Sequence, residues 1–368
     1  MVTSRAAVFM QVGEPLVVEE LRYPDPGPSE VLVKNYASGI CHSQLHQMFG
    51  TLAAPGPALL GHESTGIVEA VGADVTHVKE GDKVFVTWVP RDAAPGDPMP
   101  GRMSPLGFRD TEIAGGPASI YTWSEHTLAP EQFVVKAAED IDNSVTSIIG
   151  CAVMTGAGAV LNTANVQKGE SVAIFGIGGV GMSAVAAAAV REANPVIAID
   201  LDDEKLEFAK KFGATHTINA STEDPIAAIA ALTGPPGAVG IFGGPVSGLQ
   251  YAFDCIGVNQ TIAQIVQAVR PAEWGGVSEG GTAVLVGVPA GEAPINALDM
   301  LLGAKTLTAS IGGSSRPEND FPEFVRWYKE GMLDLDALVT KRWSLDQINE
   351  GVEDLRAGNV FGRSIIEF

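Results

Sequence analysis

The chain has 368 residues, a length at which one hydrophobic core usually gives way to two domains. Hydrophobic residues make up 46% and charged residues 18%, the composition of a globular protein rather than of a fibrous or disordered one. Lysines and arginines number 23 against 44 aspartates and glutamates, and the formal net charge of -21 argues against nucleic acid and anionic membrane surfaces as partners.

The sequence also predicts neither membrane insertion nor a disulfide framework. No run is apolar over the length of a membrane span, and the first residues lack the charged segment and apolar stretch of a signal peptide, so we expect a cytoplasmic protein. The three cysteines, Cys41, Cys151 and Cys255, are odd in number and far apart. Each is therefore a candidate for metal ligation, thiol chemistry or simple burial.

The first part of the chain predicts a compact β-rich domain. From Ala6 to Val86, short apolar runs alternate with Gly, Pro and Asp at short spacing, which is typical of strands joined by turns. Residues 90–117 are rich in Pro, Gly and Asp without a clear period, which predicts a surface loop. Regular structure is expected to resume near Tyr121.

After Cys151 the pattern changes to alternating strands and helices, which indicates βαβ units on a parallel sheet. We expect strands at 171–175, 195–200, 216–219, 251–255 and 282–288, and helices at 182–193, 204–212 and 260–270. This doubly wound domain should end near Pro289. The tail carries helical patterns at 321–329 and 345–357 and a final strand at 364–368.

A glycine-rich turn follows the first predicted strand of this domain, with the sequence Gly176-Ile177-Gly178-Gly179-Val180-Gly181. It fits the G-x-G-x-x-G pattern between a strand and a helix, where the backbone can approach a pyrophosphate at the helix N-terminus. A purely structural turn is the alternative. Asp200 ends the next strand and would bind the adenosine ribose while repelling a 2′-phosphate, so we predict NAD rather than NADP as the cofactor. Asp202 and Asp203 are interpreted as a solvated helix N-terminus.

Three short segments carry potential metal ligands. They are Cys41-His42-Ser43-Gln44-Leu45-His46, Gly61-His62-Glu63 and Gly150-Cys151-Ala152-Val153-Met154-Thr155-Gly156. These segments resemble the catalytic zinc signatures of zinc-dependent alcohol dehydrogenases, in the medium-chain dehydrogenase/reductase superfamily. The glycine-rich turn, Asp200 and the C-terminal Arg363-Ser364-Ile365-Ile366 also fall where that family places them.

The resemblance spans essentially the whole chain and implies an α/β fold of two domains. A GroES-like, β-rich catalytic domain would occupy residues 1–152, and a Rossmann domain with a doubly wound parallel sheet would bind NAD in residues 153–292. Residues 293–368 would return to complete the catalytic domain. The implied activity is reversible hydride transfer between an alcohol and NAD, giving an aldehyde or ketone.

The resemblance also assigns roles to individual residues. Cys41, His62 and Cys151 would bind one Zn²⁺ and leave its fourth position open, an arrangement suited to a Lewis acid acting on an alcohol. Ser43 and His46 would relay the proton, and Glu63 would either approach the zinc or serve as a charged neighbour. Trp88 would line the substrate pocket and favour an apolar or aromatic alcohol, or it would only pack in the core after a strand. Further cofactor contacts would come from Thr155, Lys205, Val288 and Arg363. His42 would either contact the pyrophosphate or simply line the cleft.

Two departures from the family pattern are visible. Many members bind a second, structural zinc with four close cysteines, whereas residues 90–117 contain none, so we expect one zinc per chain. Proline stiffness, packing or a neighbouring subunit could order this segment. Gln44 stands where the family usually has an aspartate that orients the ligand histidine. Cys255, inside a predicted strand, is expected to be a buried thiol without function.

Two other functions remain open from the sequence. One is a zinc-free NAD(P)H-dependent enone or quinone reductase on the same fold, and the other is a non-catalytic nucleotide-binding protein. The set of Cys41, His62 and Cys151 argues against the reductase. A non-catalytic protein would retain the ligands, the relay residues and Asp200 together only by coincidence. The expected partners are a small-molecule alcohol with its carbonyl product and further copies of the chain, as a homodimer or homotetramer.

Overall fold

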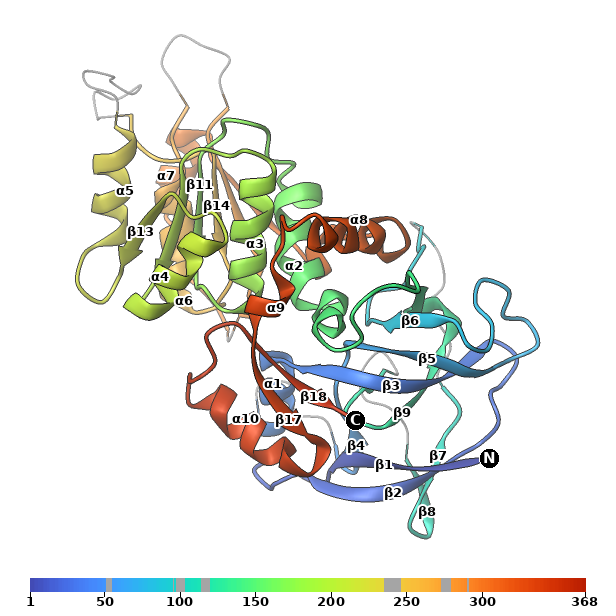
Figure 1. Ribbon diagram of the computed structural model, residues 1–368. Coiled ribbons are helices and arrows are strands. Elements are labelled where there is room, and N and C mark those ends of the chain that lie inside the picture. The colour runs from blue at the N-terminus through green and yellow to red at the C-terminus, as the bar shows by residue number, and fades with distance from the viewer. Residues whose placement is uncertain are drawn as a thin grey trace. The chain divides into compact units, whose positions relative to one another are not determined.

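The computed structural model describes residues 1–50, 55–94, 96, 103–113, 120–234, 246–272, 279–289 and 291–368 (Figure 1). The chain forms two compact units, one from Met1–Met154 with Arg316–Phe368 and one from Thr155–Ser315. The second unit runs past the predicted boundary at 292. The reason is a short strand, β16 (Thr306–Ala309), which pairs in parallel with β15 (Thr282–Leu285) and so belongs to the parallel sheet.

The first unit contains two sheets. The smaller one has the order β4-β1-β2-β7-β8 and is antiparallel throughout. Its strands are β1 (Val2–Phe9), β2 (Val17–Tyr23), β4 (Ala58–Leu59), β7 (Leu106–Phe108) and β8 (Thr111–Ile113). In β1 the last four residues are all buried, which fits a strand inside the core rather than at a wet surface.

The larger sheet of this unit has the order β10-β6-β5-β3-β18-β17, with β9 also paired to β3. Its strands are β3 (Glu30–Ile40), β5 (Ser64–Val71), β6 (Lys83–Val86), β9 (His126–Pro130), β10 (Val134–Lys136), β17 (Val339–Ser344) and β18 (Arg363–Glu367). The C-terminal strand β18 runs antiparallel to β3, with Ser364 opposite Ile40. The tail therefore pairs with the first domain and ends beside the strand that leads into Cys41.

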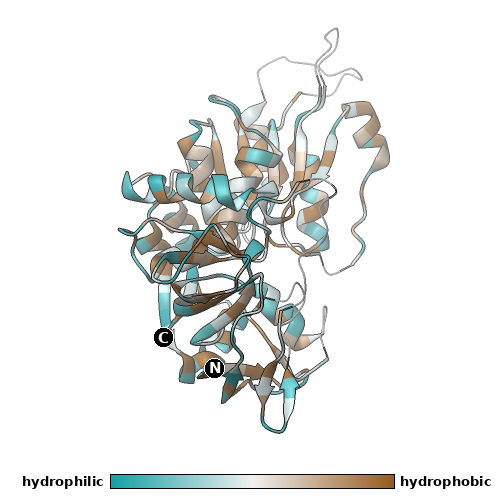
Figure 2. Cartoon of the chain, turned by 90° about the vertical axis from the view of Figure 1, so that its right-hand side faces the viewer, coloured by the Kyte–Doolittle hydropathy of each residue, from teal (hydrophilic) through white to brown (hydrophobic). Residues whose placement is uncertain are grey.

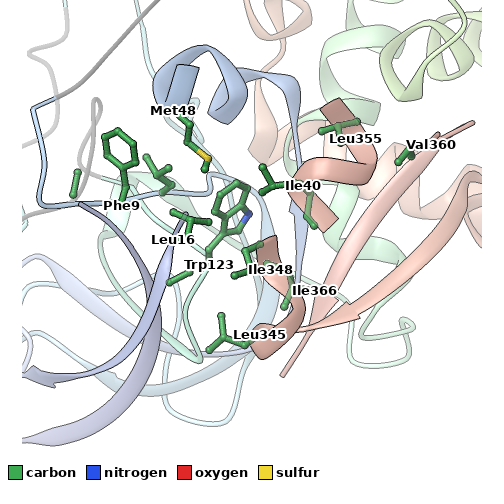
Figure 3. Packing of buried hydrophobic residues seen from close by; sticks show 14 residues of the cluster. Phe9, Leu16, Ile40, Met48, Trp123, Leu345, Ile348, Leu355, Val360 and Ile366 are labelled. Carbon is green, nitrogen blue, oxygen red and sulfur yellow. The ribbon is translucent and has the colours of Figure 1, made fainter. Parts of the chain in front are cut away.

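Helices cover one part of this sheet and complete the unit. They are α1 (His42–Phe49), α8 (Pro317–Lys329), α9 (Leu335–Leu338) and α10 (Ile348–Arg356), with 3₁₀ turns at Glu131–Phe133, Val145–Gly150 and Leu345–Gln347. Figure 3 shows the apolar cluster that joins α1 and α10 to β3 and β18, in which Ile40, Met48, Trp123, Ile348 and Ile366 are almost fully buried. The Trp123 indole also donates a hydrogen bond to the Gly39 carbonyl at 3.0 Å, which anchors the end of β3.

The segment predicted as a surface loop, residues 90–117, contains regular structure. Residues 106–113 form the hairpin β7–β8, which joins the edge of the smaller sheet through Arg22 of β2 and Gly107. Met103, Leu106, Phe108 and Ile113 are buried in one apolar cluster with Tyr23. Packing therefore orders this part of the segment, whereas residues 95, 97–102 and 114–119 lie outside the described residues.

The second unit is a six-stranded parallel sheet of order β13-β12-β11-β14-β15-β16. Besides β15 and β16, its strands are β11 (Val172–Phe175), β12 (Val196–Asp200), β13 (His216–Asn219) and β14 (Tyr251–Asp254). This is the doubly wound order of a Rossmann domain, and it confirms the predicted fold class. In Figure 2 the helices carry both brown and teal residues, as expected where helices cover a buried parallel sheet.

The helices of this unit are α3 (Gly179–Val190), α4 (Asp203–Lys211), α5 (Pro225–Thr233), α6 (Asn259–Ala268) and α7 (Ala297–Gly303). Preceding them, α2 (Ala152–Gly158) continues into a π-helical turn at Ala159–Thr163, and a 3₁₀ turn lies at Gly312–Ser314. Helix α3 begins three positions before the predicted start, directly inside the glycine-rich turn. In the described part of the chain, none of the helices has the length and apolarity needed to cross a membrane.

Candidate metal centre and dinucleotide site

Four potential ligand side chains from separate segments meet in the first unit. The ligand atoms of Cys41, His62, Glu63 and Cys151 all lie within 4.8 Å of one another. Cys41 follows β3 and is the N-cap of α1, His62 and Glu63 directly precede β5, and Cys151 follows the 3₁₀ turn at Val145–Gly150. Because β3 pairs with β5 and the 3₁₀ turn contacts both strands, the pairing of the sheet brings the three segments together.

Glycines allow this close approach. A Cβ at Gly39 would lie 2.2 Å from Oε1 of Glu63, and a Cβ at Gly150 would lie 2.8 Å from the Val86 carbonyl oxygen and 3.2 Å from Cβ of Glu63. A larger residue at Gly39 would therefore push the Glu63 carboxylate out of the cluster. Gly39 and Gly150, close to Cys41 and Cys151, therefore let the backbone of these segments pack directly against the Glu63 side chain.

The donor set of the cluster suits a zinc ion. Cys41 and Cys151 are buried, and Nε2 of His62 is a buried nitrogen without a hydrogen-bond partner among the described residues. The hydrogen bond with Cys151 and the charge of Arg363 hold the pKa of the Cys41 thiol well below its usual range, despite burial. A thiolate, a second cysteine and an unpaired imidazole nitrogen are the groups that bind Zn²⁺.

A buried ion pair closes one side of the cluster. Arg363 of β18 donates through Nη2 to Oε1 of Glu63, and the other carboxylate oxygen accepts from the Ala152 N–H at 3.3 Å. Both side chains are almost fully buried, and burial raises the pKa of Glu63 while the Arg363 charge opposes that shift. Burial alone would lower the pKa of Arg363, but the negative charges of Glu63 and the cysteines raise it above its usual range. Arg363 thus compensates the charge of the cluster.

The glycine-rich turn in the second unit has the geometry that its sequence predicts. Gly176 has φ +88°, in the left-handed region, and a Cβ at Gly181 would meet the Gly176 carbonyl oxygen at 1.8 Å. Gly178 is exposed, and a Cβ there would meet nothing within 4 Å, so space remains in front of the N-terminus of α3. The Asp200 carboxylate accepts from the Ile177 N–H at 2.7 Å and from the Leu201 N–H at 2.8 Å. The acid is therefore held beside the turn.

Known proteins resemble the chain along its whole length. Residues 27–139 match the alcohol dehydrogenase GroES-like domain family, and residues 179–330 match the zinc-binding dehydrogenase family. An alcohol dehydrogenase class-3 from Cereibacter sphaeroides is 33% identical, with 99% of this chain and 100% of that protein covered. This chain belongs to the zinc-dependent alcohol dehydrogenase family.

Solved structures of this family share the fold. An alcohol dehydrogenase zinc-binding domain protein from Burkholderia ambifaria has a TM-score of 0.87 at 30% identity, covering 100% of this chain and 99% of that one. A benzyl alcohol dehydrogenase from Acinetobacter calcoaceticus has a TM-score of 0.85 at 30% identity, with 100% of both chains covered. As a member of the zinc-dependent alcohol dehydrogenase family, the chain is an oxidoreductase.

Other residues that the sequence analysis predicted to be functional lie around the candidate metal centre. The Ser43 hydroxyl oxygen is 3.6 Å from Sγ of Cys41, and His46 lies on the same helix, α1, one turn later. The Trp88 ring stands edge-on to the His62 ring, with centroids 6.3 Å apart and planes at 77°. Ser43 and Trp88 therefore accompany the cluster, whereas His42 is an exposed residue at the start of α1.

The remaining predicted cofactor residues lie in the second unit. Thr155 has a buried hydroxyl without a hydrogen-bond partner among the described residues. Val180 lies in the first turn of α3, and Lys205 lies in the first turn of α4. Val288 follows β15 and is 39% exposed. Their cofactor contacts, like that of Arg363, stay predictions. Cys255 lies one residue beyond β14 and is half-buried, whereas the sequence predicted a buried residue inside the strand. Burial still raises the pKa of its thiol.

Sequence reasoning missed Asp254, the fully buried last residue of β14. Its carboxylate accepts from the Ile256 N–H at 3.1 Å, from the Gly257 N–H at 3.0 Å and from the Thr261 hydroxyl at 2.9 Å. It thereby holds the loop at the carboxyl end of β14, next to the glycine-rich turn. An aspartate at a strand end followed closely by a glycine is the local signal that could have indicated this turn.

Proposed function

We propose that the chain is a zinc- and NAD-dependent alcohol dehydrogenase that reversibly oxidises an apolar or aromatic alcohol to an aldehyde or ketone. The observation that carries the proposal is the convergence of Cys41, His62 and Cys151, with a buried Nε2 of His62 that has no hydrogen-bond partner in the described part of the chain. Family membership supports the same activity. A zinc ion bound by these three side chains would supply Lewis acidity towards an alcohol oxygen.

The residues around the cluster support the movement of a proton. Ser43 Oγ lies beside Cys41 and can accept a proton from a substrate hydroxyl and pass it on. His46, three positions later on α1, shares a helix face with Ser43 and suits the transfer to solvent. The paired charges of Glu63 and Arg363 add no net charge to the buried surroundings.

The second unit supports NAD as the hydride carrier. Open space before Gly178 and the N–H groups at the start of α3 suit a pyrophosphate. The carboxylate of Asp200 faces this turn and suits the hydroxyls of an unphosphorylated ribose. Nicotinamide then supplies the acceptor for a hydride from the alcohol carbon.

Trp88 supports an aromatic or apolar substrate. Its ring contacts His62 edge-on, which places a large apolar surface next to the metal ligands. The similar protein from Acinetobacter calcoaceticus is a benzyl alcohol dehydrogenase, which agrees with this preference. Benzylic alcohols are therefore the first substrates to examine.

We also propose a homodimer that forms through the edge of the parallel sheet. In the described part of the chain β16 has a strand partner on one side only, and the adjacent Leu298 and Leu301 of α7 and Ile311 are 61%, 75% and 77% exposed. An unpaired neutral edge flanked by exposed apolar side chains suits antiparallel pairing with its own copy.

The experiment that tests the enzyme assignment measures zinc per chain and the appearance of NADH with a panel of benzylic, primary and secondary alcohols. Cys41→Ser should lose zinc and turnover, whereas Cys255→Ser, outside the cluster, should keep both. Chelation should abolish turnover of the wild type. Turnover of enones or quinones by a zinc-free wild type would instead establish the reductase, and cofactor binding without any turnover would favour a non-catalytic protein.

A further inference from the structure

Asp254 is a buried carboxylate at the carboxyl end of β14. Its side chain is fully buried, and in the part of the chain that the structure describes no cationic side chain pairs with it. Burial raises the pKa of this carboxyl, although hydrogen bonds from the Thr261 hydroxyl and two backbone N–H groups oppose the shift. An asparagine could close a turn here without the cost of burying a charge. The charge therefore indicates a role that a neutral turn residue would not fill.

The carboxylate fixes the loop that follows β14, residues 255–258. Oδ1 accepts from the Ile256 N–H at 3.1 Å and from the Thr261 hydroxyl at 2.9 Å, and Oδ2 accepts from the Gly257 N–H at 3.0 Å. Hydrogen bonds to an ionised carboxylate are roughly twice as strong as bonds between neutral groups. Both oxygens are thus used to hold two successive backbone N–H groups of the loop.

This loop is packed backbone to backbone against the loop that follows β15. The Asp254 carbonyl accepts from the Gly287 N–H at 2.8 Å. A Cβ at Gly257 would lie 2.2 Å from the Val288 carbonyl oxygen, and a Cβ at Gly287 would lie 2.4 Å from the Gly257 nitrogen. Because no side chain separates the two loops at these points, neither can shift without the other.

The Ile256 side chain joins the loop to the glycine-rich turn. A Cβ at Gly176 would lie 2.2 Å from Cγ1 of Ile256, so this side chain lies directly on the glycine that begins the turn. The strands β11 and β14 are neighbours, with Phe175 opposite Asp254. Ligands of doubly wound sheets bind at this carboxyl edge. The buried acid is therefore connected to the proposed dinucleotide site through Ile256.

We propose that Asp254 is a positioning residue for the dinucleotide. Its ionised carboxylate holds the 255–258 loop so that Ile256 stays against Gly176 and the glycine-rich turn keeps the shape that binds a pyrophosphate. The inference rests on the proposed NAD site. Asp254 does not touch the cofactor in this arrangement and acts only through the loop.

The test compares two aspartates of the same unit. Asp254→Asn leaves one acceptor oxygen in place of two, so one of the two backbone N–H groups loses its partner. We expect NADH to bind about tenfold more weakly to the cofactor-free variant than to the wild type. Asp224→Asn is the matched control, because Asp224 also accepts from two backbone N–H groups, at the start of α5, and asparagine caps a helix equally well. Its NADH affinity should not change.

Hydrogen exchange of the segment 254–258 in the cofactor-free protein separates positioning from other effects. Exchange should be faster in Asp254→Asn than in the wild type and Asp224→Asn. Faster exchange with unchanged NADH affinity would overturn the inference, and so would weaker binding with unchanged exchange, because the effect would then not pass through the loop.

A second variant and the wild type complete the test. If Asp254→Asn does not fold, Thr261→Val removes one donor to the same carboxylate and should weaken NADH binding in the same direction, whereas wild-type affinity in a folded Thr261→Val would overturn the inference. A wild type that binds no NADH would instead overturn the proposed cofactor, and this inference with it.

Discussion

Two glycines of the glycine-rich turn have different structural roles, although both belong to the same motif. Gly181 packs against the Gly176 carbonyl, where a Cβ would lie at 1.8 Å, so it serves the packing of α3 on β11. Gly178 has φ −85° and ψ −165°, a conformation open to any residue, and a Cβ there would meet nothing within 4 Å. The free space at Gly178 therefore has no role in packing this unit and points to a bound cofactor.

We predict that Gly178→Ala and Gly181→Ala separate binding from stability. Gly178→Ala should keep the melting temperature of the cofactor-free protein and weaken NAD binding, because its methyl group occupies the approach to the pyrophosphate. Gly181→Ala should destabilise the fold by about 1–3 kcal/mol through overpacking. Thermal unfolding without cofactor and titration with NADH measure the two effects. Equal NADH affinity in Gly178→Ala and the wild type would contradict the proposed cofactor site.

Asp200 should determine which dinucleotide the protein accepts. Its carboxylate lies against the glycine-rich turn, where its charge would repel a 2′-phosphate. Asp200→Asn keeps the size and removes the charge, and we expect the ratio of kcat/KM for NADP to that for NAD to rise by about tenfold. Asp203→Asn removes the same charge from α4, where Asp203 accepts from Asn219, and should change the ratio much less. An unchanged ratio in Asp200→Asn would assign the preference to other residues.

At the scale of elements, the pairing of β18 with β3 places a residue near the C-terminus beside the candidate metal centre. Arg363 begins β18, whose next residue lies opposite Ile40, directly before Cys41. The Trp123 hydrogen bond and the apolar cluster of Figure 3 hold these strands against α1 and α10. The buried pair of Arg363 and Glu63 spans 300 residues of sequence and depends entirely on this pairing.

The hairpin β7–β8 should be stable without a metal of its own. Phe108 is 3% exposed in the cluster with Tyr23 and Leu106, and the chain has no cysteine between 41 and 151. We predict about one zinc per chain, and we expect Phe108→Ala to cost about 3–5 kcal/mol of stability without changing that stoichiometry. Metal analysis and thermal unfolding of both proteins provide the measurement. Two zinc ions per wild-type chain would show that this segment binds metal.

At the scale of the whole molecule, the exposed edge of the parallel sheet predicts an assembly. Leu301→Glu places a charge in the apolar surface beside β16 and should convert the proposed dimer to a monomer. Leu232→Glu on α5 changes a leucine that is 47% exposed elsewhere in the same unit and should leave the dimer intact. Light scattering after size exclusion measures both masses. A Leu301→Glu protein that remains dimeric would place the interface on another surface.

Local pattern explains which elements were predictable. The strands β11 and β12 are continuous apolar runs of four or five residues, and such runs are buried in any parallel sheet, so they were predicted within a residue or two. The hairpin β7–β8 and the strand β16 were missed because they are short and lie among residues typical of loops. Each becomes a strand only because the edge of an existing sheet accepts its backbone hydrogen bonds.

The sequence by itself determined the order of domains, the glycine-rich turn with Asp200, and the residue types that bind zinc, since these depend on near neighbours and on the chemistry of single side chains. Only the tertiary structure decided that Cys41, His62 and Cys151 converge, that Arg363 pairs with Glu63, and that Gln44 faces Nδ1 of His62. The physical reason is that such contacts join distant segments and exist only after β3, β5 and β18 have paired in register.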